Sequence, residues 1–333
     1  MATVSEPFVP HPLLRGPHRQ TLAAKFLRLE KGVCFRREQW ETRDGDAVEV
    51  DFADVEGAEW VQLGDDAPIG LLLHGLEGCA RTSYAHQMYK EFAEVGIRSV
   101  GLNFRTCGGR NPTVPRAYHA GETSDPRFVV ERLKERFPDV PLVAVGFSLG
   151  GNVLLKLLGE WGDDAPVQAA VSVSAPFDLS RCVQRIERGF SRVYSIYLRR
   201  RLQAKLVKRR GELAAYAPVA AALEARTLWG FDEHLTAPLH GFEGAEDYYA
   251  RSSSTRFLAD IATPTLLLRS TDDPFLEEDD IPHDVIGANP ALEARISRNG
   301  GHVAFVERGP SGRLRYWAEQ TAARWLSERA RQS

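Results

Sequence analysis

The stretch Pro141-Leu-Val-Ala-Val-Gly-Phe-Ser-Leu-Gly-Gly151 decides the fold. Its apolar run, residues 142–145, predicts a short strand that is buried on both faces, as strands of parallel sheets are. The motif Gly-Phe-Ser-Leu-Gly follows, and residues 152–158 then form an apolar segment of helix-favouring residues. A strand, Gly-x-Ser-x-Gly and a helix in that order indicate a nucleophile elbow, a turn that presents a serine at the end of a strand.

The serine of this motif, Ser148, is the candidate nucleophile. Glycine at 146 and 150 suits a turn so tight that larger side chains two positions from the serine would clash. The following helix directs its N-terminus, which carries partial positive charge, at the serine hydroxyl. Because Gly-x-Ser-x-Gly also arises by chance in a chain with 28 glycines, the prediction depends on the flanking strand and helix.

Composition sets the broad class. A chain of 333 residues, 43% hydrophobic and 26% charged, suits one large globular domain with an insertion, or two modest domains. The net charge of −3 argues against a nucleic-acid partner. The sequence has no run of eighteen apolar residues and therefore predicts no transmembrane span. Its first residues lack the basic start and apolar core of a signal peptide, which favours the cytoplasm.

No cofactor or metal is expected. The cysteines Cys34, Cys79, Cys107 and Cys182 are widely spaced and form no Cys-x-x-Cys pair. We interpret them as reduced thiols of a cytoplasmic protein, without a zinc site. Residues 75–83 superficially resemble a phosphate-binding loop, but no Gly-Lys-Ser/Thr follows, so nucleotide binding is not expected.

The start of the chain predicts a separate N-terminal segment, residues 1–32. Within it, residues 20–28 predict a short helix whose apolar side carries Leu22, Ala23, Phe26 and Leu29. A helix of this length is expected to dock on its own protein, although the same pattern also suits a membrane surface.

The core follows from alternating elements. Residues 33–42 and 47–54 predict strands that an Asp-Gly turn joins into a hairpin. Strands then alternate with helices, which predicts a mostly parallel sheet with right-handed crossovers. The expected elements are strands 69–74, 99–104, 142–145, 169–174, 264–269 and 291–298 and helices 84–95, 121–137 and 313–329. The α/β core therefore comprises residues 33–176 and 261–333.

The alternation stops between residues 177 and 260, where a helical pattern predicts a lid inserted into the core. This segment is rich in aromatic residues, which line an apolar pocket or pack the lid onto the core. They are Phe190, Tyr194, Tyr197, Tyr216, Trp229, Phe231, Tyr248 and Tyr249. The segment also has a basic stretch, which we interpret as a solvated helix face rather than a site for an anionic membrane. It comprises Arg192, Arg199, Arg200, Arg201, Lys205, Lys208, Arg209 and Arg210.

A serine nucleophile needs a base, and the base needs an orienting acid. In elbow folds these follow the serine in the order acid, then histidine, on loops at the carboxyl ends of strands. His302 lies in a glycine-rich loop before the last predicted helix, whereas His283 precedes the last strand and is expected at the surface. Asp273, directly before a proline, is the preferred acid; its neighbour Asp272 would cap the turn or face solvent.

The reaction also needs donors for a developing oxyanion. One is the amide of Leu149, which follows the nucleophile, and the other comes from the loop after the third strand. That loop reads His74-Gly-Leu-Glu-Gly78, and Leu76 is its candidate donor. The alternative interpretation of His-Gly is an ordinary turn after a strand.

These motifs together resemble the YheT-like branch of the α/β-hydrolases, relatives of the mammalian ABHD acyl-ester and phospholipid hydrolases. The most specific are Pro-His-x-Gln-Thr at 17–21 and Tyr-His-Ala-Gly-Glu-Thr at 118–123. The others lie at 74–78, 103–105, 146–152, 189–194, 272–275 and 300–302. The chain departs from the pattern at Thr106, where relatives often have glycine, and at Cys79. Unlike the eukaryotic relatives, it has no predicted membrane anchor.

The resemblance implies an α/β-hydrolase fold, Ser148, Asp273 and His302 as a catalytic triad, and esterase activity on acyl esters. We therefore predict a cytoplasmic serine carboxylesterase that acts on a small-molecule or lipid acyl ester. Contact with a membrane surface and the oligomeric state are left open. Two alternatives are a non-catalytic protein that binds an acyl ligand in the lid pocket, and a thioesterase or amidase with the same triad. A binding protein has no need of nucleophile, base, acid and oxyanion turn in order.

Overall fold

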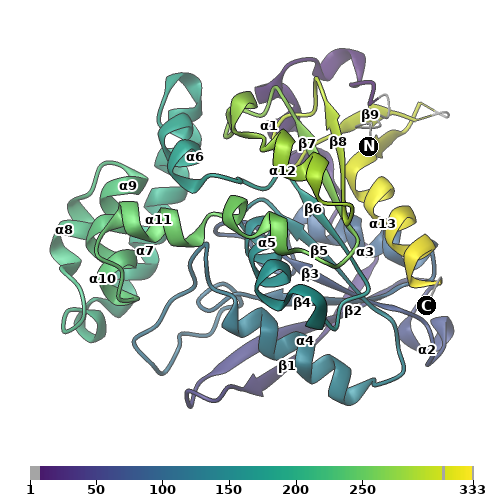
Figure 1. The fold of residues 1–333 in the computed structure, drawn as a ribbon, viewed down its shortest axis with the longest axis horizontal. Helices are drawn as coiled ribbons and strands as arrows, with labels where there is room; N and C mark the ends of the chain where they lie inside the picture. Colours follow the sequence, from purple (N-terminus) through teal and green to yellow (C-terminus); the bar gives the residue numbers. More distant parts are fainter. Residues whose placement is uncertain (1–7, 310–311, 332–333) are drawn as a thin grey trace.

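A computed structural model describes residues 8–309 and 312–331 (Figure 1). Its centre is an eight-stranded sheet in the order β1-β2-β4-β3-β5-β6-β7-β8. The β1–β2 and β2–β4 pairs are antiparallel, and all the other neighbours run parallel. The predicted fold class, a mostly parallel sheet that begins with an antiparallel hairpin, is therefore confirmed. The strands are β1 (Val33–Glu41), β2 (Ala47–Val55), β3 (Ile69–Leu73), β4 (Arg98–Asn103), β5 (Leu142–Phe147), β6 (Ala169–Val173), β7 (Thr265–Ser270) and β8 (Leu292–Ser297).

Helices cover both faces of this sheet, so its central strands are buried on both sides. In β5, Leu142 and Ala144 belong to one apolar core, and Val143, Val145 and Phe147 belong to another. This alternation follows from the two-residue period of a strand. The first core includes α4 and α5, and the second includes α3 and α13. The helices outside the β6–β7 connection are α1 (Pro17–Leu27), α2 (Trp60–Leu63), α3 (Ser83–Glu94), α4 (Ser124–Arg136), α5 (Leu149–Trp161), α12 (His283–Ala288) and α13 (Trp317–Ala330).

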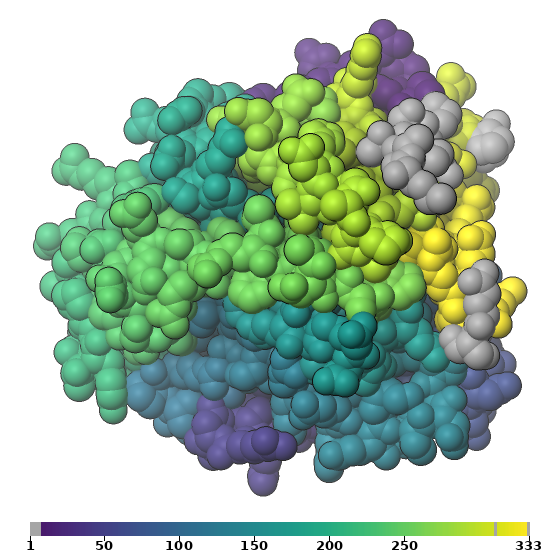
Figure 2. All heavy atoms as spheres, in the orientation of Figure 1, coloured from purple at the N-terminus to yellow at the C-terminus, as the bar shows by residue number. Residues whose placement is uncertain are grey.

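The connection from β6 to β7 is helical, and Figure 1 shows its helices gathered at one side of the sheet. In the space-filling view its teal and green residues form one end of the molecule, opposite the yellow C-terminal helix (Figure 2). Its elements are α6 (Leu179–Ile186), η3 (Gly189–Ser191), α7 (Arg192–Leu213), α8 (Val219–Glu224), α9 (Leu228–Phe231), the π-helical turn η4 (Asp232–Thr236), α10 (Ala237–Leu239), α11 (Ala245–Ser252), η5 (Ser254–Arg256) and η6 (Leu258–Asp260). The remaining short turns are η1 (Pro12–Leu14), η2 (Gly162–Asp164) and η7 (Glu278–Asp280).

The predicted starts of the last helix and of α4 were wrong, and α1 begins three residues earlier than expected. The last helix begins at Trp317 and not at 313, because Leu314–Tyr316 forms a strand, β10, that pairs with β9 (Val306–Arg308). Tyr316 packs there beside Val306 in a small apolar cluster. Helix α4 begins at Ser124 and not at 121, because the Glu122 carboxylate accepts the Ser124 amide 2.7 Å away and so caps the first turn.

The N-terminal helix α1 docks on its own protein as predicted, but through a different face. Its buried residues are Gln20 and Ala24, and the Gln20 side chain both donates to and accepts from the backbone of Val306. The predicted contact face is exposed, with Phe26 76% exposed and Leu22 40% exposed. A two-way amide hydrogen bond and the small buried side chain of Ala24 therefore seat this helix, and its larger apolar residues do not. The predicted N-terminal segment also includes residues 1–7, which lie outside the described residues.

The turn around Ser148 is as tight as the glycine pattern requires. Ser148 itself has φ 52° and ψ −120°, and α5 begins at the next residue, three residues earlier than expected. A Cβ atom on Gly146 would lie 2.4 Å from the Gly150 carbonyl oxygen, and one on Gly150 would lie 2.3 Å from that of Leu73. Both contacts are with backbone, so a side chain at either position would push the first turn of α5 away from β5 or from β3.

We expect Gly150→Ala to destabilise the protein by at least about 2 kcal/mol, since overpacking against backbone costs this much or more. Gly211→Ala, in helix α7, is the matched control: its Cβ meets nothing within 4 Å, and alanine in a helix gains up to about 1 kcal/mol over glycine. Urea unfolding measures both. If the two variants were equally stable, the conclusion that Gly150 has no room for a side chain would be wrong.

Candidate active site

The structure brings Ser148, His302 and Asp273 into one hydrogen-bonded chain. Ser148 follows β5, Asp273 follows β7 and His302 follows β8, so all three lie at the carboxyl ends of parallel strands. The His302 Nε2 atom is 2.8 Å from the Ser148 Oγ atom. The His302 Nδ1 atom is 2.8 Å from an Asp273 carboxylate oxygen. This is the arrangement that lets a histidine take a serine proton while a carboxylate fixes its orientation.

The two adjacent aspartates have different partners. The second Asp273 oxygen accepts the Phe275 amide at 2.8 Å, which leaves the first oxygen directed at His302. Asp272 instead accepts the Gly301 amide at 2.9 Å and so fastens the loop that carries His302. Burial raises the pKa of Asp272 above its ordinary value. Both outcomes expected for Asp272 were therefore wrong: it is partly buried and bonds across to the loop of His302, and does not cap its own turn or face solvent.

Sequence reasoning missed two residues that hold the His302 ring and loop. The Phe275 ring stacks on the imidazole, with centroids 4.0 Å apart and planes 11° apart. The Thr21 hydroxyl of α1 accepts the His302 amide at 2.9 Å. Both residues lie within motifs of the family resemblance, which was the available signal. His283 is exposed at the start of α12, as predicted.

The turn at 74–78 lies against the elbow, since a Cβ on Gly75 would be 3.2 Å from that of Ser148. The Gly75 amide donates to the Tyr84 hydroxyl at 2.9 Å, and the Glu77 amide donates to the Tyr118 hydroxyl at 2.9 Å. In the described part of the chain no acceptor takes the Leu76 amide, which lies between them. The Leu149 amide opens helix α5. Of the two predicted oxyanion donors, the Leu76 amide is thus unpaired and the Leu149 amide lies at a helix N-terminus.

His74 anchors this turn from the core. Its side chain is fully buried, its Nδ1 atom is 2.7 Å from the Gly75 carbonyl oxygen, and its Nε2 atom accepts the Phe104 amide at 3.2 Å. Burial lowers the pKa of His74 to about 4, so the ring is neutral at pH 7. A neutral ring matches one donated and one accepted hydrogen bond.

Glu77 connects the turn to helix α7. The Lys205 ammonium is 2.7 Å from the Glu77 carboxylate, and the Tyr118 hydroxyl donates to the same oxygen at 2.9 Å. The Arg201 guanidinium donates to the Glu77 carbonyl at 3.3 Å. The basic stretch is therefore not all solvated: Lys205 and Arg209 hold α7 on the core, the latter through the Val114 and Arg116 carbonyls. Arg192, Arg200, Lys208 and Arg210 are exposed, as both the solvated and the membrane interpretation of the stretch require.

Two hollows meet at Ser148. The first is an apolar cavity of about 150 Å³ between the sheet and the β6–β7 helices. Its walls include Leu76, Leu149, Val183, Leu202, Phe231, Tyr248 and Tyr249. The second is a cleft of about 470 Å³ between α1 and α7, and Thr21, Phe26, Tyr197 and His302 line it. A substrate with two parts joined at the reacting carbon has room for one part in each.

The predicted aromatic residues divide among three roles. Phe231, Tyr248 and Tyr249 line the cavity, and Tyr197 lines the cleft. Trp229 packs on Tyr249, and Tyr194 packs on Phe275. Phe190 and Tyr216 are exposed. Both interpretations of the aromatic pattern are thus partly correct.

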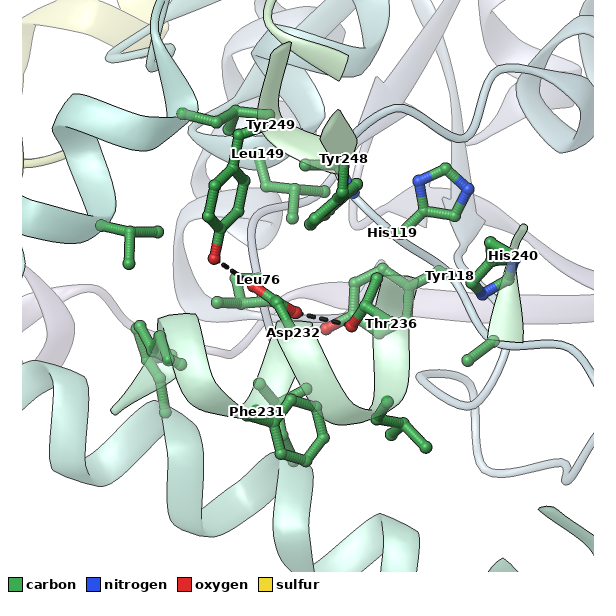
Figure 3. Close-up of a pocket in the computed structure, with 18 of the residues that line it drawn as sticks. Leu76, Tyr118, His119, Leu149, Phe231, Asp232, Thr236, His240, Tyr248 and Tyr249 are labelled. Carbon is green, nitrogen blue, oxygen red and sulfur yellow. Dashed lines mark hydrogen bonds between the residues drawn. The ribbon is translucent and has the colours of Figure 1, made fainter. Parts of the chain in front are cut away.

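A buried carboxyl group lies in the cavity wall. Figure 3 shows Asp232 between Tyr249 and Thr236, whose hydroxyls donate to it at 2.7 Å and 2.5 Å. Burial raises the pKa of Asp232 to about 6.

Among the described residues, no group of three or more His, Cys, Asp or Glu side chains suits a metal ion. All four cysteines are free thiols.

We expect Asp232→Asn to gain stability relative to the native chain as pH rises. The folded-state pKa of about 6 exceeds the ordinary 3.8. The contribution of this group to the stability of the native chain is therefore full below pH 4, and it is lost as pH rises from about 4 through 6. Since one pKa unit equals about 1.4 kcal/mol, the difference should change by roughly 2–3 kcal/mol across this window. Urea unfolding at a series of pH values tests this. A constant difference would contradict it.

The fold is that of an α/β-hydrolase, and comparison with known proteins agrees. Residues 71–309 match the family model for the alpha/beta hydrolase fold. The chain is 35% identical over 325 residues to "Putative esterase YheT" of Escherichia coli, covering 97% of this chain and 94% of that one. It is 30% identical over 305 residues to "Phospholipase ABHD3" of Mus musculus, covering 91% and 74%. The chain belongs to the α/β-hydrolase family, in the branch of YheT and its relatives.

A solved structure of the Pyrococcus furiosus esterase Pf2001 has the same fold, with a TM-score of 0.55 at 15% identity over 98% of this chain and 96% of that one. The relatives at 30–35% identity, named esterase and phospholipase, make the chain an esterase-type hydrolase, as predicted. No helix in the described ranges is both long and apolar enough to cross a membrane.

Proposed function

We propose that this chain is a serine carboxylesterase that cleaves acyl esters through Ser148, His302, Asp273 and an acyl-enzyme intermediate. The observation that carries the proposal is the continuous contact from Asp273 to His302 to Ser148, with both distances 2.8 Å. A binding protein needs no such chain, and the strained φ of 52° at Ser148 is the kind of cost that functional sites carry. Four free cysteines suit a reducing compartment, so we propose the cytoplasm as its location.

In this mechanism the His302 Nε2 atom takes the Ser148 proton as the Oγ atom attacks the ester carbonyl. The Leu76 and Leu149 amides stabilise the oxyanion, and Asp273 holds the imidazolium that forms. The tetrahedral intermediate then collapses: the bond to the leaving alkoxide breaks, and His302 returns its proton to that oxygen. Water, activated by the same histidine, releases the acid and restores the serine.

Each of the two hollows would hold one part of the ester substrate. The acyl chain fits the apolar cavity, because burial of methylene groups there is favourable. The alcohol part fits the cleft, which is the more polar of the two and carries Lys25, Glu30 and Arg201. The helical segment 177–260 then acts as a lid whose inner wall forms most of the acyl cavity.

We expect a fluorophosphonate probe to label Ser148 and Ser148→Ala to abolish the labelling. The same change should lower kcat at least about 10³-fold, since members of a triad act as a unit. Ser83→Ala is the matched control, because Ser83 lines the same cleft but has no base beside it. Mass spectrometry of the labelled peptide and hydrolysis of a p-nitrophenyl ester measure both effects. Labelling that survives Ser148→Ala would refute the proposal.

We expect kcat/KM on p-nitrophenyl esters to rise roughly threefold per added methylene, since each buried methylene contributes about 0.8 kcal/mol. An apolar protein cavity of about 150 Å³ holds a benzene molecule, so the rise should end near six carbons. Val183→Phe fills part of the cavity and should shift the optimum to shorter chains.

Val207→Phe, on the same helical segment but exposed and outside the cavity, should leave the optimum unchanged. A flat profile from two carbons onward would mean that the cavity does not receive the acyl chain.

A further inference from the structure

Exposed apolar side chains gather around the cleft that reaches Ser148. They come from α1 and from the η3–α7 corner, two elements that lie far apart in the sequence. Phe26 is 76% exposed, Phe190 is 55% exposed and Val193 is 54% exposed. We call the set the rim; its members are Leu22, Phe26, Phe190, Val193, Ile196 and Tyr197.

The rim is one surface, because α1 and α7 touch. The His18 ring lies 4.6 Å from the Phe190 ring and hydrogen-bonds the Tyr194 hydroxyl at 3.2 Å. About two helical turns further along α1, the Lys25 ammonium donates to the Tyr197 hydroxyl at 3.3 Å. Leu22 lies between His18 and Lys25 on the same stripe of α1. Contiguous apolar surface of this kind usually marks an interaction site on a soluble domain.

Positive charge accompanies the rim, although the whole chain carries −3. Residues 15–31 include five basic residues and one acidic residue, and α7 includes eight basic and one acidic. The exposed side chains of Arg19, Arg192 and Arg200 have no ion-pair partner among the residues described. Apolar groups surrounded by unpaired cations match a bilayer with anionic head groups, whose surface attracts lysine and arginine.

We propose that the rim docks on the surface of an anionic lipid bilayer, with the cleft open toward the lipid. Phe26 and Tyr197 belong to both the rim and the cleft wall, so a docked molecule presents the path to Ser148 at the membrane. The proposal concerns binding and does not require that the chain hydrolyse an ester.

The experiment is co-sedimentation of the full chain with vesicles of phosphatidylcholine alone and with vesicles in which about a third of the lipid is phosphatidylglycerol. We expect binding to the second kind, weakened by salt. Phe190→Asp/Val193→Asp should reduce it about tenfold or more, since it replaces two apolar contacts with charges that repel the surface. Arg192→Gln/Arg200→Gln should also reduce it about tenfold, and only on the anionic vesicles.

Val61→Asp is the matched control: Val61 is 93% exposed on α2, at the opposite end of the molecule from α7 (Figure 1). It should bind as the native chain does, and so should Ser148→Ala, which separates docking from catalysis. Circular dichroism and urea unfolding show whether the Phe190→Asp/Val193→Asp variant is folded, and neither measurement depends on catalysis. Failure to sediment, equal binding to both vesicles, or unchanged binding of that variant would overturn the proposal. A dimer in sedimentation velocity that the same variant dissociates would overturn it too, and would assign the rim to a second copy.

Discussion

The close approach of three backbone segments at Ser148 is the constraint on which the rest of the structure depends. The first turn of α5 lies within van der Waals contact of the end of β3, which is why Gly150 has no room for a side chain. This contact sets the elbow, the oxyanion turn and the core strands in one arrangement. The positive φ of Ser148 is held because buried strands on either side leave the chain no other path.

Features that depend on neighbouring residues could be predicted from the sequence. The buried strands, the hairpin and the elbow each rest on a short pattern, and the order of Ser148, Asp273 and His302 places them on loops at one sheet edge. Thr106 shows the limit of such reasoning. The family resemblance marks it as an unusual residue, and the structure gives the reason: its φ of 72° lies in the region that favours glycine.

Features that depend on contacts across the chain could not be predicted. The apolar pattern of α1 pointed to a buried face, yet Gln20 pairs with Val306, a residue 286 positions away, and turns that face outward. The strand β10 forms because β9 is there to pair with it. The basic stretch gave no sign that Lys205 reaches Glu77, because the partner lies 128 residues earlier.

The Lys205–Glu77 contact also has a mechanical consequence. The Glu77 side chain is only 1% exposed, so if α7 moved away, a buried carboxylate would lose its cation. Such a separation is costly, and the helix therefore resists displacement as long as the carboxylate stays in place. Glu77 directly follows Leu76, so the ion pair joins helix α7 to the turn that carries the proposed oxyanion donor. An ion pair thus connects the wall of the cavity proposed for the acyl chain to the turn proposed for the oxyanion.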